Sequence, residues 1–84
     1  MAYRVIIKRS AEKELDTLQK DIQRRIIARL LALEGNPRPH GIKRLQGENA
    51  YRLRTGEYRV LYTIDDEEKI VTIFTIGHCR EVYR

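Results

Sequence analysis

Six side chains in the second half of the chain could act together on a phosphate group. Three are arginines in an alternating stretch and three follow near the end of the chain: Arg52, Arg54, Arg59, His78, Arg80 and Tyr83. Guanidinium groups bind phosphate oxygens through paired, charge-assisted hydrogen bonds. A histidine can move a proton near neutral pH, and a tyrosine can stack on a nucleobase or, beside cations that lower its pKa, transfer a proton. The set predicts a phosphate-binding face that could also be catalytic.

The arginines are expected on one face of a β-hairpin formed by Ala50–Tyr62. Gly56-Glu57 separates two alternating runs and favours a two-residue turn. This turn would set Arg54 opposite Arg59, with Arg52 on the same face, and would send the other residues to the core side: Tyr51, Leu53, Tyr58, Val60 and Tyr62. Like charges directly opposite each other destabilise a sheet. The register therefore predicts an anion between Arg54 and Arg59; the plainer alternative is a set of solvent-facing arginines.

The composition is that of one small basic domain spanning residues 1–84. The chain has 42% hydrophobic residues and a formal net charge of +5 at pH 7. Residues 36–59 carry 6 basic and 2 acidic groups, whereas residues 60–84 carry 3 basic and 5 acidic groups. A basic centre favours nucleic acid or an acidic protein partner, although a merely solvated surface would look the same. A single cysteine, Cys79, excludes an intrachain disulfide and suits the cytoplasm.

Several classes of site are excluded by the residues present. One cysteine and two separated histidines, His40 and His78, cannot supply a closed set of metal ligands. No phosphate loop or dinucleotide fingerprint occurs, so we expect no metal and no cofactor. His78 and Cys79 are neighbours on an extended chain and point apart, which argues against a cysteine nucleophile. No apolar run reaches the roughly 18 residues of a membrane span, and no signal peptide is expected.

The first half of the chain predicts a strand followed by two helices. Ala2–Ile7 alternates as a strand does. A helix is expected over Ala11–Leu18 with Ser10 as its N-cap. A second is expected over Ile22–Glu34, with Asp21 as its N-cap and Gly35 just beyond its C-terminus. Its core stripe would contain Ile22, Ile26, Leu30 and Leu33, widened by Ile27 and Leu31.

The second half adds a meander of strands. Ile42–Leu45 is expected to be a short extended piece whose Lys43 and Arg44 contact RNA. The hairpin follows, then a solvated acidic turn at residues 65–68. The last strand is expected over Lys69–Ile76 and has apolar residues on both faces, which is typical of a central strand; one face would hold Ile70, Phe74 and Ile76, the other Val71 and Ile73. The fold class predicted is therefore α+β: a strand, a helical hairpin and a three-stranded antiparallel meander, with both helices on one sheet face and the arginines on the other.

Three segments of this sequence carry a family resemblance. In order along the chain they are YRLR, GEYRVLY and GHCREVY, and the opening YRVIIKRSAEKELDTL also fits. The chain resembles RelE-type toxins of the RelE/ParE superfamily of toxin–antitoxin systems over nearly its whole length. The resemblance implies a microbial-ribonuclease-like fold. It also implies a toxin that enters the ribosomal A site, cleaves mRNA there without a metal ion, and is held inactive by a cognate RelB-like antitoxin.

The resemblance also implies roles for the basic and aromatic residues. Arg52 and Arg54 match two lysines of the family's strand, Arg59 matches its arginine and Tyr83 matches the tyrosine of its terminal motif. Arg80 stands for a further family arginine, although the spacing here is shorter. Arginine in place of both lysines keeps phosphate binding but removes a possible base, a role that His78 could take. Two other readings stay open: a ParE-like poison of DNA gyrase, and an inactive basic partner of an acidic antitoxin.

Overall fold

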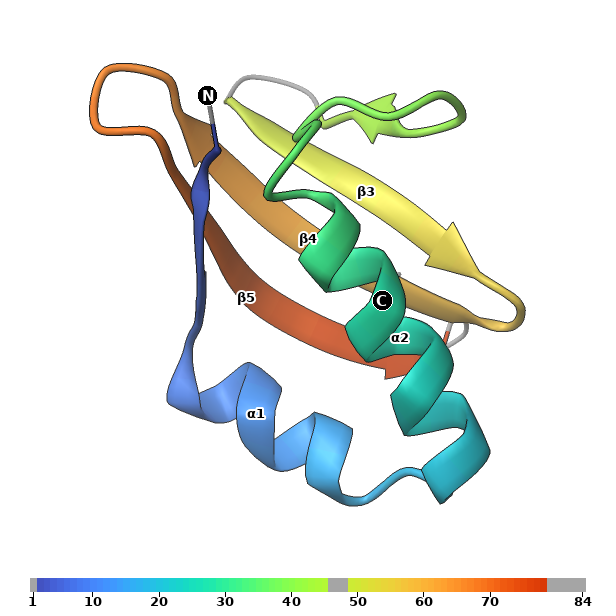
Figure 1. The fold of residues 1–84 in the computed structure, drawn as a ribbon. Helices are drawn as coiled ribbons and strands as arrows, with labels where there is room; N and C mark the ends of the chain where they lie inside the picture. Colours follow the sequence, from blue (N-terminus) through green and yellow to red (C-terminus); the bar gives the residue numbers. More distant parts are fainter. Residues whose placement is uncertain (1, 46–48, 79–84) are drawn as a thin grey trace.

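A five-stranded mixed sheet organises the fold, which a computed structural model describes for residues 2–45 and 49–78 (Figure 1). The elements are, in chain order, β1 (Arg4–Ile7), α1 (Arg9–Asp16), α2 (Lys20–Ala32), β2 (Lys43–Arg44), β3 (Ala50–Thr55), β4 (Tyr58–Asp65) and β5 (Ile70–His78). The strand order is β1-β5-β4-β3-β2. β1 pairs with β5 in parallel, and the other neighbours are antiparallel. The predicted α+β class and the β3–β4–β5 meander are confirmed.

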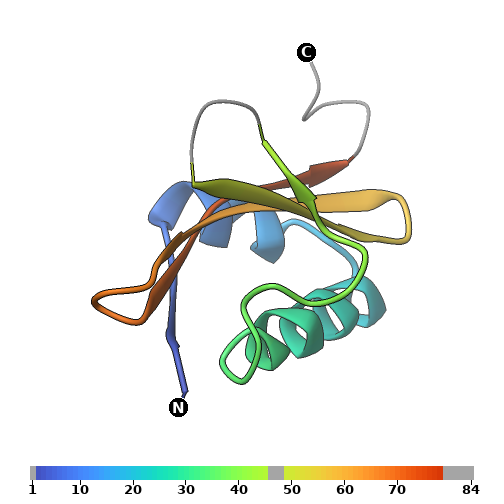
Figure 2. The same ribbon diagram turned by 90° about the horizontal axis from the view of Figure 1, so that it is seen from above.

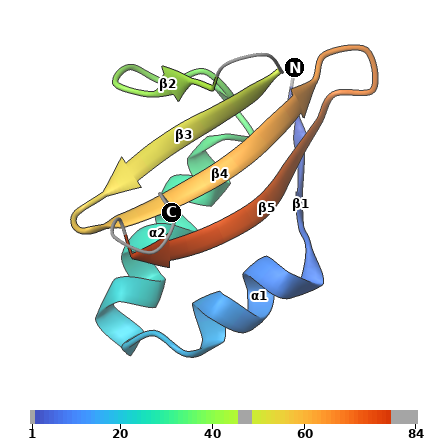
Figure 3. The same ribbon diagram turned by 180° about the vertical axis from the view of Figure 1, so that it is seen from behind.

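The hairpin of β3 and β4 has the register that its turn predicts (Figure 3). Arg54 pairs with Arg59, Leu53 with Val60, and Tyr51 with Tyr62. The turn itself places Gly56 at φ +62°, a backbone conformation that glycine adopts without strain. A Gly-X pair of this kind twists in the same sense as the strands that it joins. The turn chemistry therefore fixes which residues of β3 and β4 share a face.

Both helices lie on the same face of the sheet, and the opposite face, called the uncovered face below, carries no helix of residues 2–45 and 49–78 (Figure 2). The core between the two layers is apolar and contains Ile26, Leu30, Leu33, Leu53, Val60, Tyr62, Val71, Ile73 and Ile76, each at most 2% exposed. α1 and α2 have 8 and 13 residues, too short to be stable alone. The helices therefore depend on this buried face.

The core stripe of α2 is narrower than the sequence suggested. Ile26 and Leu30 are buried, but Ile27 is 41% exposed and Leu31 57% exposed. The prediction that these two residues widen the stripe is wrong. Each follows a buried residue by one position, which turns it about 100° around the helix and away from the sheet. An apolar pair is thus left on the outer side of α2.

The helix boundaries also differ from the predicted ones. α1 begins after Lys8 and α2 after Gln19, and neither cap side chain makes a hydrogen bond. Ser10 and Asp21 lie inside the helices, so the predicted N-caps are wrong. The backbone N–H of Lys8 donates to the carbonyl of Ile73 at 2.9 Å, so the last sheet bond, instead of a capping side chain, sets where α1 starts.

The C-terminal end of α2 also lies earlier than predicted. The helix ends at Ala32 with Leu33 as its C-cap, so Gly35 is not the residue just beyond the cap. Gly35 is also not among the glycines with positive φ, which are Gly41 and Gly56. Its backbone N–H still donates to the carbonyl of Ala32 at 3.2 Å, and closes the last turn.

A bulge in β5 changes which of its residues face the core. Leu61 of β4 pairs with Thr75, but the next residue of β4, Tyr62, pairs with Ile73, so Phe74 is an extra residue between them. The alternation shifts by one at this point, and Ile76 is buried on the same side as Ile73. The prediction that Ile76 shares a face with Ile70 and Phe74 is therefore wrong, whereas Ile70 and Phe74 do lie on the face opposite Val71 and Ile73. β5 is nevertheless a central strand, as predicted.

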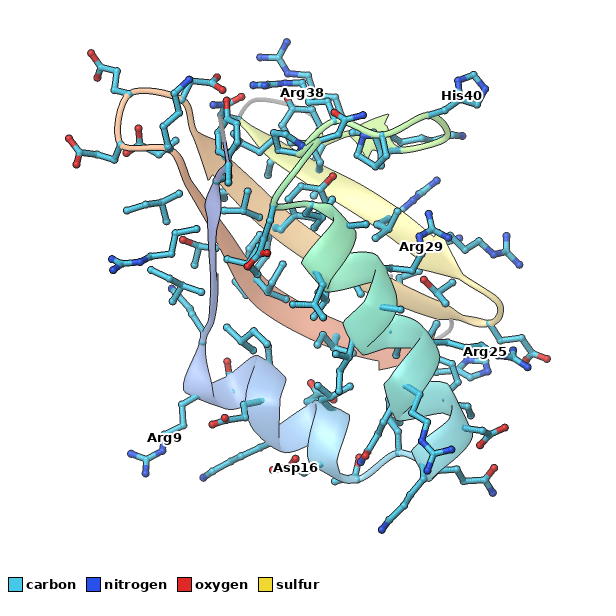
Figure 4. The ribbon with its side chains drawn as sticks, in the orientation of Figure 1. Arg9, Asp16, Arg25, Arg29, Arg38 and His40 are labelled. Carbon is cyan, nitrogen blue, oxygen red and sulfur yellow. The ribbon has the colours of Figure 1, made fainter. Side chains whose placement is uncertain are left out.

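An ion pair ties the loop after α2 to the end of the sheet away from the β3–β4 turn (Figure 4). Both terminal nitrogens of Arg38 donate to Asp66, at 3.1 and 2.8 Å, and its Nε donates to the hydroxyl of Tyr51 at 3.1 Å. The hydroxyl of Tyr3 also donates to Asp66, at 2.7 Å. These contacts, that of Arg38 foremost, lower the pKa of Asp66 to about 2 and raise that of Arg38. The prediction of a merely solvated acidic turn is therefore wrong for Asp66.

A second hydrogen bond anchors the same loop from the core. The hydroxyl of Tyr62 donates to the carbonyl of Pro37 at 2.9 Å, and its ring stacks on that of Tyr51 with centroids 5.8 Å apart. Burial, followed by the neighbouring Tyr51, raises the pKa of Tyr62 to about 12, so the hydroxyl remains a donor at neutral pH. The loop after α2 is therefore held by an ion pair at the surface and by a hydrogen bond from the core.

We expect the contribution of Asp66 to stability to vanish in acid. Its folded-state pKa of about 2 lies below the ordinary 3.8, so the stabilisation is fully present above about pH 4 and is lost as the pH falls toward 2. Thermal unfolding of wild type and Asp66→Asn should differ most at pH 6, and the difference should shrink as the pH falls below 4 toward 2. Glu67→Gln, in the same turn, serves as the control. A difference at pH 2 as large as that at pH 6 would contradict the ion-pair account.

Candidate nucleic-acid interface

Three arginines lie together on the uncovered face of the sheet, at the end nearest the β3–β4 turn. Arg54 pairs directly with Arg59, and Arg59 pairs on its other side with Gly77 of β5. Arg52 lies two residues before Arg54 and pairs with Leu61. Residues directly opposite in an antiparallel pair have Cβ atoms about 4.5–5.5 Å apart. Two guanidinium groups at this spacing can reach the oxygens of one phosphate.

The surroundings of the arginines hold their side chains close to the sheet. The Nε of Arg54 donates to the carbonyl of Gly56 at 2.9 Å, which directs an otherwise exposed side chain along the turn. Arg52 and Arg59 are half-buried and interact with other groups of the protein. Gly77 beside Arg59 adds no side chain on this face. The cross-strand partners of the arginines are arginine, leucine, glycine and Lys43 of β2, none of them acidic. Positive charge is thus concentrated at this end of the face.

The short edge strand β2 adds one more cation to this face. Lys43 pairs with Arg52, and Arg44 pairs with Tyr51. Paired residues share a face, so Lys43 lies beside the arginines, whereas Arg44 belongs to the side on which Tyr51 is buried. Both side chains are exposed. Of the two predicted RNA contacts, only Lys43 is therefore brought next to the arginines.

The structure does not bring His78 to the arginines. His78 pairs with Tyr58, on the helix side of the sheet, and the two rings meet edge to face with centroids 5.5 Å apart. Its Nε2 lies 3.1 Å from Oε1 of Glu57, at hydrogen-bond distance. A pocket of about 360 Å³ opens here between α2 and the turn, lined by Ile22, Arg25, Thr55, Gly56, Glu57, Tyr58 and His78. Arg80 and Tyr83, the other two predicted site residues, lie outside the described residues.

Further along the uncovered face is a groove that the sequence did not predict. It measures about 270 Å³ and is lined by Lys8, Ala50, Thr63, Thr72 and Phe74. The threonines offered a signal, because polar residues alternate with buried ones on β4 and β5. Phe74 lies two residues after Thr72, so the alternation of β5 places it on the same side.

A family comparison decides the class of protein. The model that describes the ParE toxin of the type II toxin–antitoxin system parDE matches residues 5–83. The chain belongs to this family. It is therefore a type II toxin of the RelE/ParE superfamily, as the sequence motifs indicated. No curated protein gives a significant match to the chain.

Solved structures of RelE toxins share the fold. The toxin–antitoxin complex RelBE2 from Mycobacterium tuberculosis matches with a TM-score of 0.82 and 30% identity over 93% of this chain and 99% of that one. The archaeal RelE–RelB complex from Pyrococcus horikoshii matches with 0.82 and 30% over 94% and 97%. A mutant of the E. coli toxin RelE in the free state matches with 0.81 and 28% over 99% and 92%. These matches confirm the RelE-like fold.

Two further observations concern the described part of the chain. Within residues 2–45 and 49–78, no helix is long and apolar enough to cross a membrane. Over the same residues, no three His, Cys, Asp or Glu side chains gather in a way that could hold a metal ion.

We expect inorganic phosphate to stabilise the fold through the Arg54–Arg59 pair. At a dissociation constant of roughly 10 mM, 50 mM phosphate would add about 1 kcal/mol to the free energy of unfolding. Thermal unfolding in phosphate and in chloride of equal ionic strength measures this effect. Arg54→Gln should lose most of it, and Arg9→Gln, an exposed arginine of α1, should keep it. Equal stabilisation by both salts would show that no anion site exists there.

Proposed function

We propose that this toxin is an endoribonuclease that cleaves mRNA on the ribosome, with its uncovered sheet face against the RNA. The observation that supports this most is the direct pairing of Arg54 with Arg59 on a face without a helix, with Arg52 and Lys43 beside them. Such a pair sets two like charges opposite each other, and an anion bound beside them would reduce their repulsion. An RNA phosphate is an anion of suitable size and charge. We take the 84 residues to act as one domain, in the cytoplasm.

Cleavage of RNA at a phosphate requires three kinds of group. A base removes the proton of the 2′-hydroxyl, cations stabilise the pentavalent phosphate, and an acid protonates the leaving 5′-oxygen. We assign stabilisation of the phosphate to Arg59 and Arg80, and positioning of the RNA to Arg52, Arg54 and Lys43. None of these roles calls for a metal ion.

Proton transfer is the role that arginine cannot fill, because it stays protonated. The strand that carries lysines in relatives carries arginines here. His78 lies on the helix side of the sheet, where it contacts Glu57 and Tyr58. We therefore do not propose that His78 exchanges a proton with RNA bound on the other face. We propose Tyr83 as the acid–base group, or as the ring that stacks on a base of the substrate.

A poison of DNA gyrase is the second candidate, because the family model that matches the chain is that of the ParE toxin. The two readings differ in the target of the basic face. A gyrase poison would alter supercoiling and induce the DNA-damage response while mRNA stays intact.

We also propose a RelB-like antitoxin as the partner, since RelE is bound to RelB in the similar complexes. The outer side of α2 suits such a partner. Ile27 and Leu31 lie one turn apart and are exposed, with Arg24 on the same stripe. Arg25 and Arg29 project from another side of this helix (Figure 4). An amphipathic acidic segment of the antitoxin would cover the apolar pair and neutralise Arg24, whereas a second copy of this basic face would be repelled.

The nuclease reading predicts cuts inside translated codons. Expression of wild type without antitoxin should arrest growth, and mapping of mRNA 5′ ends should show these cuts. Arg59→Ala should lower cleavage by about 100-fold or more, because it removes a cation from the pentavalent phosphate. Tyr83→Phe should also restore growth, and Arg9→Gln should stay toxic. Growth arrest with intact mRNA would overturn the proposal, and altered supercoiling would then favour the gyrase reading.

The antitoxin reading predicts a variant that separates binding from toxicity. Ile27→Glu with Leu31→Glu should lower antitoxin affinity by roughly 10-fold or more, because it places charges in an apolar contact. Growth arrest by this variant should persist when the antitoxin is coexpressed. Ile6→Glu, on β1, is the control and should still be neutralised, because Ile6 is the third large apolar side chain exposed among the described residues. Unchanged affinity of the double variant would mean that the antitoxin binds elsewhere.

A further inference from the structure

The groove on the uncovered face lies on the same strands, β3 and β4, as the arginines. Thr63 of β4 pairs with Ala50 on one side and Thr72 on the other, so the floor crosses three strands. Arg59 lies four residues before Thr63 on β4 and on the same side of the sheet. At about 3.3–3.4 Å per residue, the groove is about 13 Å from the Arg54–Arg59 pair. One strand of RNA can therefore touch both.

The position of Phe74 in the groove needs an explanation. It is the only phenylalanine in the chain, yet it is half-buried on the helix-free side and does not belong to the hydrophobic core. The alternation of β5 places it there beside Thr72, while its neighbour Ile73 is fully buried. The bulge then adds Thr75 on the same side, and bulges are common next to active sites. An aromatic ring on an open, basic sheet face is a stacking platform for nucleobases.

The other lining residues suit the edge of a base and its phosphate. The hydroxyl groups of Thr63 and Thr72 can each donate and accept a hydrogen bond, as a nucleobase edge requires. Ala50 is small and leaves the space above the floor to a ligand. Lys8 lies at the β1 side of the groove and supplies a positive charge for a backbone phosphate.

We propose that this groove binds a nucleobase of the same RNA whose phosphate lies on the arginines. The base stacks on Phe74, and Thr63 and Thr72 bind its edge. This inference rests on the proposed function and extends it, because it gives the toxin a base-reading subsite apart from the site of the cut. The nature of the base in the groove would then influence which codons are cut.

Photo-crosslinking locates the base directly. The probe is a single-stranded RNA of 2′-O-methyl nucleotides, which cannot be cleaved, with 4-thiouridine at successive positions. After irradiation with the purified toxin, mass spectrometry identifies the linked residues. We expect one probe position to link to Phe74 or Thr72, and positions nearby to link to residues around the arginines. Links around the arginines with none in the groove would overturn the inference and leave the proposed function standing. An absence of links anywhere on this face would overturn both.

Binding affinity for the same RNA without thiouridine, measured for variants of Phe74, tests the stacking role separately. Phe74→Leu keeps an apolar side chain but removes the ring, and should weaken binding roughly 5- to 100-fold. Phe74→Trp restores a stacking surface and should bind at least as well as wild type. Ile70→Leu, on the same strand outside the groove, should change nothing. Equal affinity of wild type and Phe74→Leu, with both folded by circular dichroism, would contradict the stacking role.

Discussion

The register of the β3–β4 hairpin is the constraint on which the rest of the structure depends. A slip by one residue would exchange the two faces and bury Arg52, Arg54 and Arg59. The apolar face resists such a slip, because burial of each large side chain such as Leu53 or Tyr62 is worth about 1.5–3 kcal/mol. The repulsion of two facing arginines is smaller, at about 0.2–1 kcal/mol. The apolar core thus keeps Arg54 and Arg59 opposite each other against their mutual repulsion, which a bound anion would reduce.

The two faces of the sheet, and its two ends, have different roles. The helix side is closed by an apolar core, and the far end is fastened by Arg38, Asp66 and Tyr62. The helix-free side stays accessible, with charge near the turn and a groove farther along. An RNA strand on this face would meet guanidinium groups first and an aromatic ring next. Affinity from phosphates and selectivity from bases can then come from separate residues.

Short-range chemistry explains what the sequence could predict. The Gly-X turn determined the hairpin register, and alternation in β3 and β4 determined the faces of the three arginines. The wrong helix start and the unpredicted ion pair have a different cause, which is contact between residues far apart in the sequence. The start of α1 follows a sheet bond from Lys8, and the pair of Arg38 and Asp66 joins residues 28 positions apart. Neither contact leaves a local mark in the sequence.

The bulge of β5 was hidden for another reason. In the run from Ile70 to Ile76, apolar residues and threonines fit either alternation, so one extra residue cannot be read from the pattern. The bulge decided one site assignment, since it left His78 on the helix side instead of beside the arginines. The exposure of Ile27 and Leu31 was equally hidden, because an isoleucine or leucine on α2 looks the same whether a sheet or an antitoxin covers it.

The central claim is that the arginine face holds the phosphate at which mRNA is cut. Purified ribosomes carrying a defined mRNA, mixed with the purified toxin, test this most directly when the A-site codon contains either ribose or 2′-deoxyribose. We predict cleavage within the ribose codon by wild type, none within the 2′-deoxy codon, and little by Arg59→Ala. Cleavage of the 2′-deoxy codon, or equal cleavage by wild type and Arg59→Ala, would contradict the account.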